Sequence, residues 1–268
     1  MKWAFALLLL LAPAAQAETI ILASTTSVEN AGLLARILPA FTARSGIIVH
    51  VLAQGSGQAL ATAARGDADL VLVHDPEAEA EFMASGHGLR RVEIAWNDFL
   101  LVGPAADPAG LKGTTDAVAA LAKVAAAARP FISRGDRSGT DALEKRLWRE
   151  AAIQPVGQPW YKEIGGGMGA ALNMAAAIDA ITLTDRGTWL AFGNRRSMVE
   201  LISGDPRLIN RYRVIELNPA RHPTAHLAAA HTLAEYLASP EGQTAIAAVT
   251  IEGEALFRPG VRVVVIGQ

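Results

Sequence analysis

Short β-branched segments alternate with alanine-rich helical segments along most of this sequence, and this alternation limits the folds open to the chain. Residues 19–23, 47–53 and 70–73 are rich in isoleucine, leucine and valine, and polar or glycine-containing loops follow the first two. A repeated strand–loop–helix order is typical of α/β folds with mostly parallel strands. Because ligands of such sheets bind at the carboxyl ends of the strands, we expect the functional site in these loops.

The pattern predicts two α/β lobes between which the chain crosses twice. We expect the crossings near residues 95–102 and 206–214, so that residues 18–97 and 206–268 form the first lobe and residues 98–205 form the second. Each lobe is predicted to hold a mostly parallel sheet flanked by helices, with the ligand in the cleft between the lobes.

The first residues have the order of an export signal. A positive charge at Lys2 precedes the apolar residues 3–12, and the small residues Ala15 and Ala17 mark a cleavage site. We therefore expect residues 1–17 to be removed, the mature chain to begin at Glu18, and the protein to reside in the periplasm. The chain contains no cysteine, so neither a lipid anchor nor a disulfide is expected.

The charge distribution argues against a polyanionic partner. The formal net charge is −2, and no basic stripe or charge block is present. Nucleic-acid binding relies on clustered lysine and arginine side chains, so we do not expect it here. Any anion site must therefore be formed by a few residues rather than by a broad positive surface. We expect the protein to act as a monomer.

Residues 131–140 place arginine, serine, threonine and glycine residues directly before a helical pattern. The free N–H groups and the positive dipole end of a helix N-terminus attract anions. The planar guanidinium group of Arg134 matches a tetrahedral oxyanion. The segment therefore predicts a site for a small oxyanion such as phosphate, sulfate, molybdate or tungstate.

Two other loops, at residues 24–27 and 55–57, have the same character. Serine, threonine and glycine are also common caps at helix starts, so one such loop predicts little. Three of them in one chain, one with an arginine, favour an anion site. We expect helices at 28–41 and 141–152 to follow the first and third loops.

The charged residues near these loops receive different roles. Arg134 is a candidate ligand, whereas Arg137 is expected to be solvated. A carboxylate would repel a dianion, so we expect Asp136 to hold Arg134 rather than to touch the ligand. Arg186 is a candidate anion-binding or hinge residue, and an ordinary ion pair is an equally good interpretation.

Other chemistries have little support in the sequence. There is no cysteine nucleophile and no G-x-S-x-G pattern, and Ser138 has no recognisable partner base, so hydrolytic or phosphoryl-transfer catalysis is not expected. His74 lacks a second histidine at ligand spacing. His222, His226 and His231 do not match a metal-binding motif either and are expected on the surface. We predict a protein without metal, cofactor or catalytic residues.

Taken together, these motifs resemble the periplasmic tungstate-binding proteins of ABC transporters, within the type II periplasmic binding proteins. The similarity extends over nearly the whole mature chain. The matching segments are residues 24–27, 55–60, 66–74, 97–99, 102–104, 133–140, 167–169, 182–188, 218–219 and 239–243.

This resemblance implies two lobes that close on a dehydrated oxyanion, tungstate with molybdate as a weaker competitor, for delivery to an inner-membrane ABC permease. Ser24 stands where the family commonly has threonine, and its hydroxyl can still donate. With Asp136 and Arg186, Ser24 is a candidate supporting or hinge residue. Carried over by matching motif, the oxyanion ligands would be Thr25, Thr26, Ser56, Arg134, Ser138, Gly139 and Thr140.

Phosphate capture by the same fold is the alternative, since the order of residues 134–140 is also similar to that of phosphate-binding proteins of this superfamily. Phosphate near neutral pH carries a proton and benefits from a carboxylate acceptor, whereas tungstate and molybdate need donors alone. Asp75 would favour phosphate if its carboxylate pointed into the cleft.

Overall fold

The computed structural model describes residues 17–251 and 253–264, so all but the last residue of the expected leader at 1–17 lies outside the described part. The helices are α1 (Thr26–Asn30), α2 (Leu33–Ser45), α3 (Ser56–Ala64), α4 (Pro76–Ala84), α5 (Ala117–Ala126), α6 (Gly139–Glu150), α7 (Met168–Ala177), α8 (Arg186–Ala191), α9 (Leu227–Ala238), α10 (Pro240–Ala247) and the short 3₁₀ helix η1 (Pro206–Leu208). The strands are β1 (Thr19–Thr25), β2 (Ile48–Gln54), β3 (Leu70–Val73), β4 (Gly88–Pro104), β5 (Phe131–Ser133), β6 (Tyr161–Glu163), β7 (Ile181–Asp185), β8 (Met198–Ile202), β9 (Ile209–Leu217), β10 (Thr250–Ile251), β11 (Glu254–Ala255) and β12 (Arg258–Val264).

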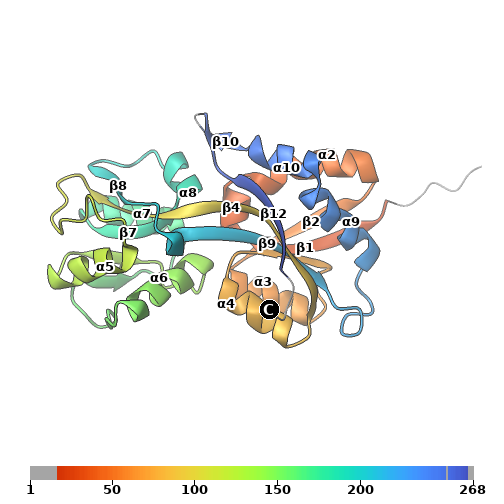
Figure 1. Cartoon of the computed structure of the whole chain (residues 1–268), viewed down its shortest axis with the longest axis horizontal. Coiled ribbons are helices and arrows are strands. Elements are labelled where there is room, and N and C mark those ends of the chain that lie inside the picture. Colours follow the sequence, from red (N-terminus) through yellow and green to blue (C-terminus); the bar gives the residue numbers. More distant parts are fainter. Residues whose placement is uncertain (1–16, 252, 265–268) are drawn as a thin grey trace, which may run out of the picture.

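One continuous run of strands organises the molecule, in the order β2-β1-β3-β9-β4-β7-β5-β6, and β8 and β12 both pair with β4. Strand β4 belongs to two groups. Its first part pairs with β9 and β12, and its last part pairs with β7 and β8. We call β1, β2, β3, β9, β12 and the start of β4 the first strand group, and β5 to β8 with the end of β4 the second. Figure 1 shows β4 and β9 passing between them.

Helices cover both faces of each strand group. In the first group, α2, α9 and α10 pack on one face, and α3 and α4 pack on the other. In the second group, α5 and α6 cover one face, and α7 and α8 cover the other. Four separate clusters of buried apolar side chains result, two for each strand group, and this layered packing is that of an α/β fold.

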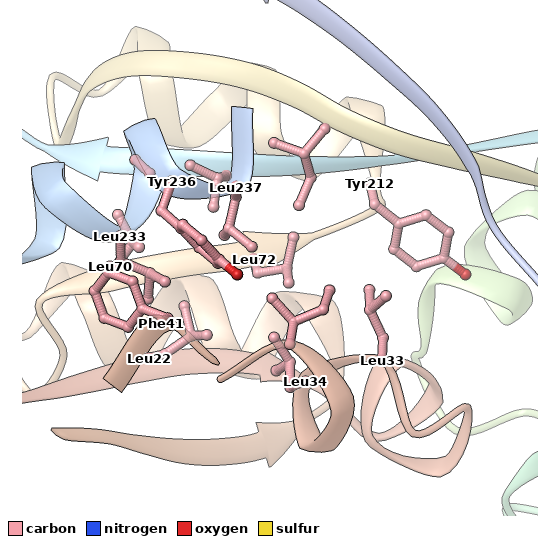
Figure 2. Close-up of a cluster of buried hydrophobic side chains, with 14 of the residues drawn as sticks. Leu22, Leu33, Leu34, Phe41, Leu70, Leu72, Tyr212, Leu233, Tyr236 and Leu237 are labelled. Atoms are coloured by element: carbon pink, nitrogen blue, oxygen red, sulfur yellow. The ribbon is translucent and has the colours of Figure 1, made fainter. Parts of the chain in front are cut away.

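The largest of these clusters lies between the first strand group and the helices α2, α9 and α10. Figure 2 shows Phe41 beside Tyr236 and the leucines of β1 and β3 beneath α9. The rings of Phe41 and Tyr236 are 5.3 Å apart. Tyr212 lies at the edge of the cluster, and its hydroxyl group points away from the leucines.

The prediction of mostly parallel sheets holds for only part of each strand group. Strands β2, β1 and β3 are parallel to one another, as are β6, β5 and β7. Every pair that involves β4 or β9 is antiparallel. Strand β9 lies antiparallel beside β3 in the first group, and β4 lies antiparallel beside β7 in the second. The two long strands are also antiparallel to each other.

Two helix starts also differ from expectation. The helix expected at 28–41 is divided into α1 and α2, because Gly32 adopts a left-handed conformation with φ 71° between them. The helix expected at 141–152 begins earlier, at Gly139, with Ser138 as its N-cap. This shift places one predicted ligand, Ser138, at the N-cap and two, Gly139 and Thr140, in the first turn of α6. Among the described residues, no helix is both long and apolar enough to cross a membrane.

Candidate anion-binding site

A pocket of about 460 Å³ lies where loops from the two strand groups meet. The first group contributes Thr26 and Ser27 from α1, and Gln54 and Gly55 from the end of β2. The second contributes the loop between β5 and α6, residues 165–168 and Thr188 of α8. The pocket therefore lies at the carboxyl ends of strands, as predicted for an α/β sheet.

Helix N-termini surround this pocket. Three helices longer than two turns begin at the pocket: α3 directly after Gly55, α6 after its cap Ser138, and α7 at Met168. The residues Gly55, Ser138 and Met168 all line the pocket. Shorter helices α1 and α8 also begin there. Each N-terminus presents unpaired N–H groups and a partial positive charge, so their convergence favours an anion over a cation or a neutral ligand.

Arg134 supplies the full positive charge of the pocket. Its side chain is 7% exposed, and its Nε donates to Asp136 Oδ2 over 3.0 Å. Its Nη1 donates to Thr140 Oγ1 over 3.3 Å. The other carboxylate oxygen of Asp136 accepts a hydrogen bond from the Ser138 amide at 3.1 Å. Asp136 thus lines the pocket with both oxygens already used, and its charge is balanced by the guanidinium group.

The loop after β1 places several hydroxyl groups together. Thr25 caps α1, and its Oγ1 accepts a hydrogen bond from the Val28 amide at 3.3 Å. Thr25 Oγ1 also lies 3.0 Å from Ser27 Oγ. Thr26 lines the pocket. Ser24 is fully buried, and its Oγ has no hydrogen-bond partner among the described residues.

Ser56 and Gly139 lie together behind the pocket. Ser56 is the first residue of α3, and its buried Oγ has no hydrogen-bond partner in the part of the chain that the structure describes. A Cβ atom added to Gly139 would lie 3.3 Å from that Oγ and 2.9 Å from His74 Cε1. Glycine at this position lets α3, α6 and β3 approach one another.

The structure therefore brings Thr26, Arg134, Asp136 and Ser138 into the wall of one pocket and packs the other predicted residues of the three loops against it. Arg186 lies elsewhere. Its Nε and Nη2 donate to the carboxylate of Asp98 over 2.7 and 2.6 Å, and its Nη1 donates to Glu200 over 3.1 Å. It lines a different pocket of about 810 Å³, so its ion-pair interpretation is the better one.

Asp75 also has a defined structural role. It is the N-cap of α4, and its Oδ1 accepts a hydrogen bond from the Ala78 amide at 3.3 Å. It is not among the described residues that line the pocket. Burial raises the pKa of Asp75 above its ordinary value, and the cap hydrogen bond opposes that shift.

Sequence reasoning missed several residues of this pocket. Ser27 lies in the first predicted loop, but the sequence did not mark it as a ligand. Thr188 lies two positions after Arg186, which was the candidate in that segment. The glycine-rich residues 165–169 suggest only a tight turn before a helix, but α7 begins within them at Met168, and residues 165–168 line the pocket. His74 was set aside for lack of a metal partner, yet its Nε2 lies 2.9 Å from Ser27 Oγ.

The other histidines differ from expectation in one case. His226 and His231 are exposed, but His222 is only 4% exposed, and its Nε2 lies 3.1 Å from His87 Nδ1. Glu216, His231 and Glu235 form the one group of potential metal ligands found among the described residues. Arg90 donates to both glutamates, so a protein cation already offsets part of their charge.

Comparison with known proteins agrees with this arrangement. Residues 12–241 match the PBP superfamily domain. The tungstate-binding protein TupA of Peptoclostridium acidaminophilum is 42% identical over 245 residues, which cover 90% of this chain and 85% of that protein. The structure of the tungstate-binding protein TupA from Desulfovibrio alaskensis is 40% identical, with a TM-score of 0.82 over 92% of this chain and all of that one.

A crystal structure of the tungstate ABC transporter from Geobacter sulfurreducens is 41% identical, with a TM-score of 0.76 over 85% of this chain and 97% of that one. Each of these similarities covers at least 85% of the chain. The chain therefore belongs to the PBP superfamily and, within it, to the TupA family of tungstate-binding proteins.

Proposed function

We propose that this protein is the solute-binding component of an ABC transporter and captures tungstate, with molybdate as a weaker competitor, for delivery to the permease. The observation that carries the proposal is the convergence of helix N-termini, hydroxyl groups and Arg134 on one pocket whose single lining carboxylate is already paired. Such a pocket offers many donors and no free carboxylate. It suits a fully deprotonated tetrahedral dianion and needs no catalytic group.

We further propose that the two strand groups are the cores of two lobes, residues 18–97 with 206–268 and residues 98–205. The separate apolar clusters support this division, and strands β4 and β9 would form the connection. An anion that bonds to loops of both lobes would stabilise the closed state. Cleavage after residue 17 would leave the protein free in the periplasm.

At the pocket and directly behind its wall, we propose that Thr25, Thr26, Ser56, Arg134, Ser138, Gly139 and Thr140 bind the anion. Asp136 would hold the guanidinium fork, and Ser24 would support the first loop. Phosphate remains the weaker candidate, because Asp75 caps α4 and supplies no acceptor to the pocket wall. Hydrogen phosphate would then have no free carboxylate to receive its proton.

Titration calorimetry on the mature chain with tungstate, molybdate, sulfate and phosphate tests the proposal. We expect tungstate to bind most tightly and phosphate to displace it poorly at equal concentration. Arg134→Lys should weaken tungstate binding by roughly 10- to 100-fold, because a charged hydrogen bond is worth about 1.5–3 kcal/mol and lysine lacks the fork.

Arg137→Lys is the matched control, since Arg137 is exposed in the same loop and should tolerate the change. Unchanged tungstate affinity in Arg134→Lys would overturn the assignment of the site. Strong displacement of tungstate by phosphate would favour the phosphate alternative instead.

A further inference from the structure

Ion pairs between α4 and α6 join the two strand groups outside the anion pocket. Glu77 lies in the first turn of α4, which packs on the first group, and Arg146 and Arg149 lie in the second half of α6, which packs on the second. Glu77 Oε1 lies 3.4 Å from Arg146 Nη1, and Glu77 Oε2 lies 3.6 Å from Arg149 Nη2. None of the three residues lines the pocket. Figure 1 shows α4 and α6 facing each other where the groups meet.

The charges of these ion pairs are complementary across the boundary between the strand groups. For each arginine, Glu77 is the one acidic partner among the described residues. Arg146 is also close enough to Asp75, the N-cap of α4, to oppose the rise in pKa that burial causes in that carboxyl group. Two acidic groups at the start of α4 therefore face two cations on α6.

Each charge also suits its own helix, which gives a local explanation for its presence. The helix dipole favours an acidic side chain in the first turn and a basic one in the last turn, as Glu77 and Arg149 are placed. This local effect does not require the charges of two helices to meet. Glu81 provides a comparison, because it lies one turn further along α4, is exposed, and forms no ion pair among the described residues.

The α4–α6 ion pairs require the two strand groups to lie close together. In this structure the groups are in contact, since a Cβ atom on Gly139 of α6 would lie 3.3 Å from Ser56 Oγ of α3. If the proposed lobes moved apart, water and salt would screen the separated charges. The attraction would then be lost in the open state. A contact made in the closed state alone shifts the same equilibrium that the ligand shifts.

We propose that Glu77, Arg146 and Arg149 are positioning residues that hold the two lobes in the closed state and so raise the affinity for the oxyanion without touching it. The inference rests on the proposed function, because it assumes that the lobes close on an anion in this pocket. The ion pairs form as the lobes close around a ligand that has already entered. They therefore slow the release of the anion more than they speed its association.

Neutralising Glu77 tests this role by the sign of its effect. Glu77→Gln removes a negative charge from a protein that binds a dianion, so attraction of the ligand alone would leave tungstate affinity unchanged or raise it. The ion-pair role predicts a loss of about two- to fivefold by titration calorimetry, because exposed ion pairs contribute modestly. Glu81→Gln is the matched control, since it removes the same charge from the same helix, and it should not lower the affinity.

A charge swap tests whether the residues act on one another. Glu77→Arg places three cations together and should lower tungstate affinity by about tenfold or more. Arg146→Glu should lower the affinity in the wild-type background but raise it by at least about threefold beside Glu77→Arg, because an opposite pair is restored. Thermal unfolding of each variant without ligand shows whether the fold is kept.

Stopped-flow kinetics separate closure of the lobes from electrostatic steering of the ligand. In Glu77→Gln the rate of tungstate release should rise by the same factor by which the affinity falls, with the association rate constant within about twofold of wild type. The difference in affinity between this variant and wild type should shrink as NaCl rises from about 50 mM to about 500 mM, because salt screens exposed charges.

Unchanged or higher tungstate affinity in Glu77→Gln would overturn the inference and leave the proposed function intact. An equal loss in Glu81→Gln would overturn it in the same way, because the effect would then not depend on the arginines of α6. A wild-type protein that bound none of tungstate, molybdate, sulfate and phosphate would contradict the proposed function, and the inference with it.

Discussion

Replacing Gly139 by alanine provides a stringent test of how closely the loops must approach behind the pocket. The added Cβ would lie 2.9 Å from His74 Cε1, 3.0 Å from His74 Nδ1 and 3.3 Å from Ser56 Oγ. Carbon atoms in contact prefer about 3.5–4.0 Å, so the ring or α6 must shift by roughly half an ångström or more. Both neighbours are buried, and neither can move into solvent.

The expected cost follows from this overlap. Overpacking a buried site costs about 1–3 kcal/mol. A loss of about 2 kcal/mol corresponds to a fall of roughly 4–8 °C in Tm for a chain of this size. Because the displaced atoms adjoin the pocket, we also expect tungstate affinity to fall by about tenfold or more, which corresponds to about 1.4 kcal/mol.

Differential scanning fluorimetry and titration calorimetry measure the two effects. Gly57→Ala is the matched control, since Gly57 lies at the equivalent end of α3, is exposed, and has no atom within 4 Å of the added Cβ. It should keep its tungstate affinity and gain up to about 1 kcal/mol from helix propensity. If Gly139→Ala matched this control in Tm and affinity, the close packing of His74 against α6 would be refuted.

Further predictions concern pH and a buried cap. Burial raises the pKa of Glu144 from 4.5 to about 7, although Tyr161 donates a hydrogen bond to it, so this group should cost about 3 kcal/mol of stability as pH rises from 4.5 through 7. The pKa of His74 is lowered from 6.5 to about 4, so its contribution should be lost as pH falls from 6.5 to 4, again by about 3 kcal/mol. Burial also raises the pKa of Glu79 to about 7, so Glu79 adds a fall of similar size over the same range. Compared with wild type, urea unfolding between pH 4.5 and 7 should therefore show a weaker fall of stability with pH in Glu144→Gln and a steeper fall in His74→Gln, and equal slopes in both variants would contradict this reasoning. Asp205, 2% exposed, accepts a hydrogen bond from the Ala117 amide at 2.7 Å; Asp205→Ala should cost about 1–3 kcal/mol by leaving that donor unpaired, and an unchanged urea midpoint would show that water replaces it.

Much of the anion site was predictable from sequence because its chemistry is local. A hydroxyl group or glycine at a helix start can be recognised from a few adjacent residues, and Arg134 stands out in such a loop. The partnership of Arg134 with Asp136 is also local, since the two residues are two positions apart. Contacts between distant segments could not be found in this way. His74 lies 47 positions from Ser27, and nothing in the spacing of either residue indicates the other.

Arg186 also shows that a contact with a distant segment can decide the role of a residue. Its sequence neighbours left an anion-binding role and an ion pair equally plausible. Its partner Asp98 lies 88 positions away on β4, and the two-pronged contact between them assigns the arginine to the ion pair. Likewise, Asp75 could have faced the ligand or capped α4, and the choice depends on where the helix begins.

Local sequence alone established the α/β character of the chain, the family resemblance and the three loops that favour an oxyanion, because periodicity, caps and charge are properties of neighbouring residues. Tertiary structure was needed to show that β4 and β9 run antiparallel through both strand groups, and that five helix N-termini meet at one pocket. It also revealed that a buried histidine supports the first loop. These features depend on strand pairing and packing between residues far apart in the chain, and their free energy comes from contacts that no short segment contains.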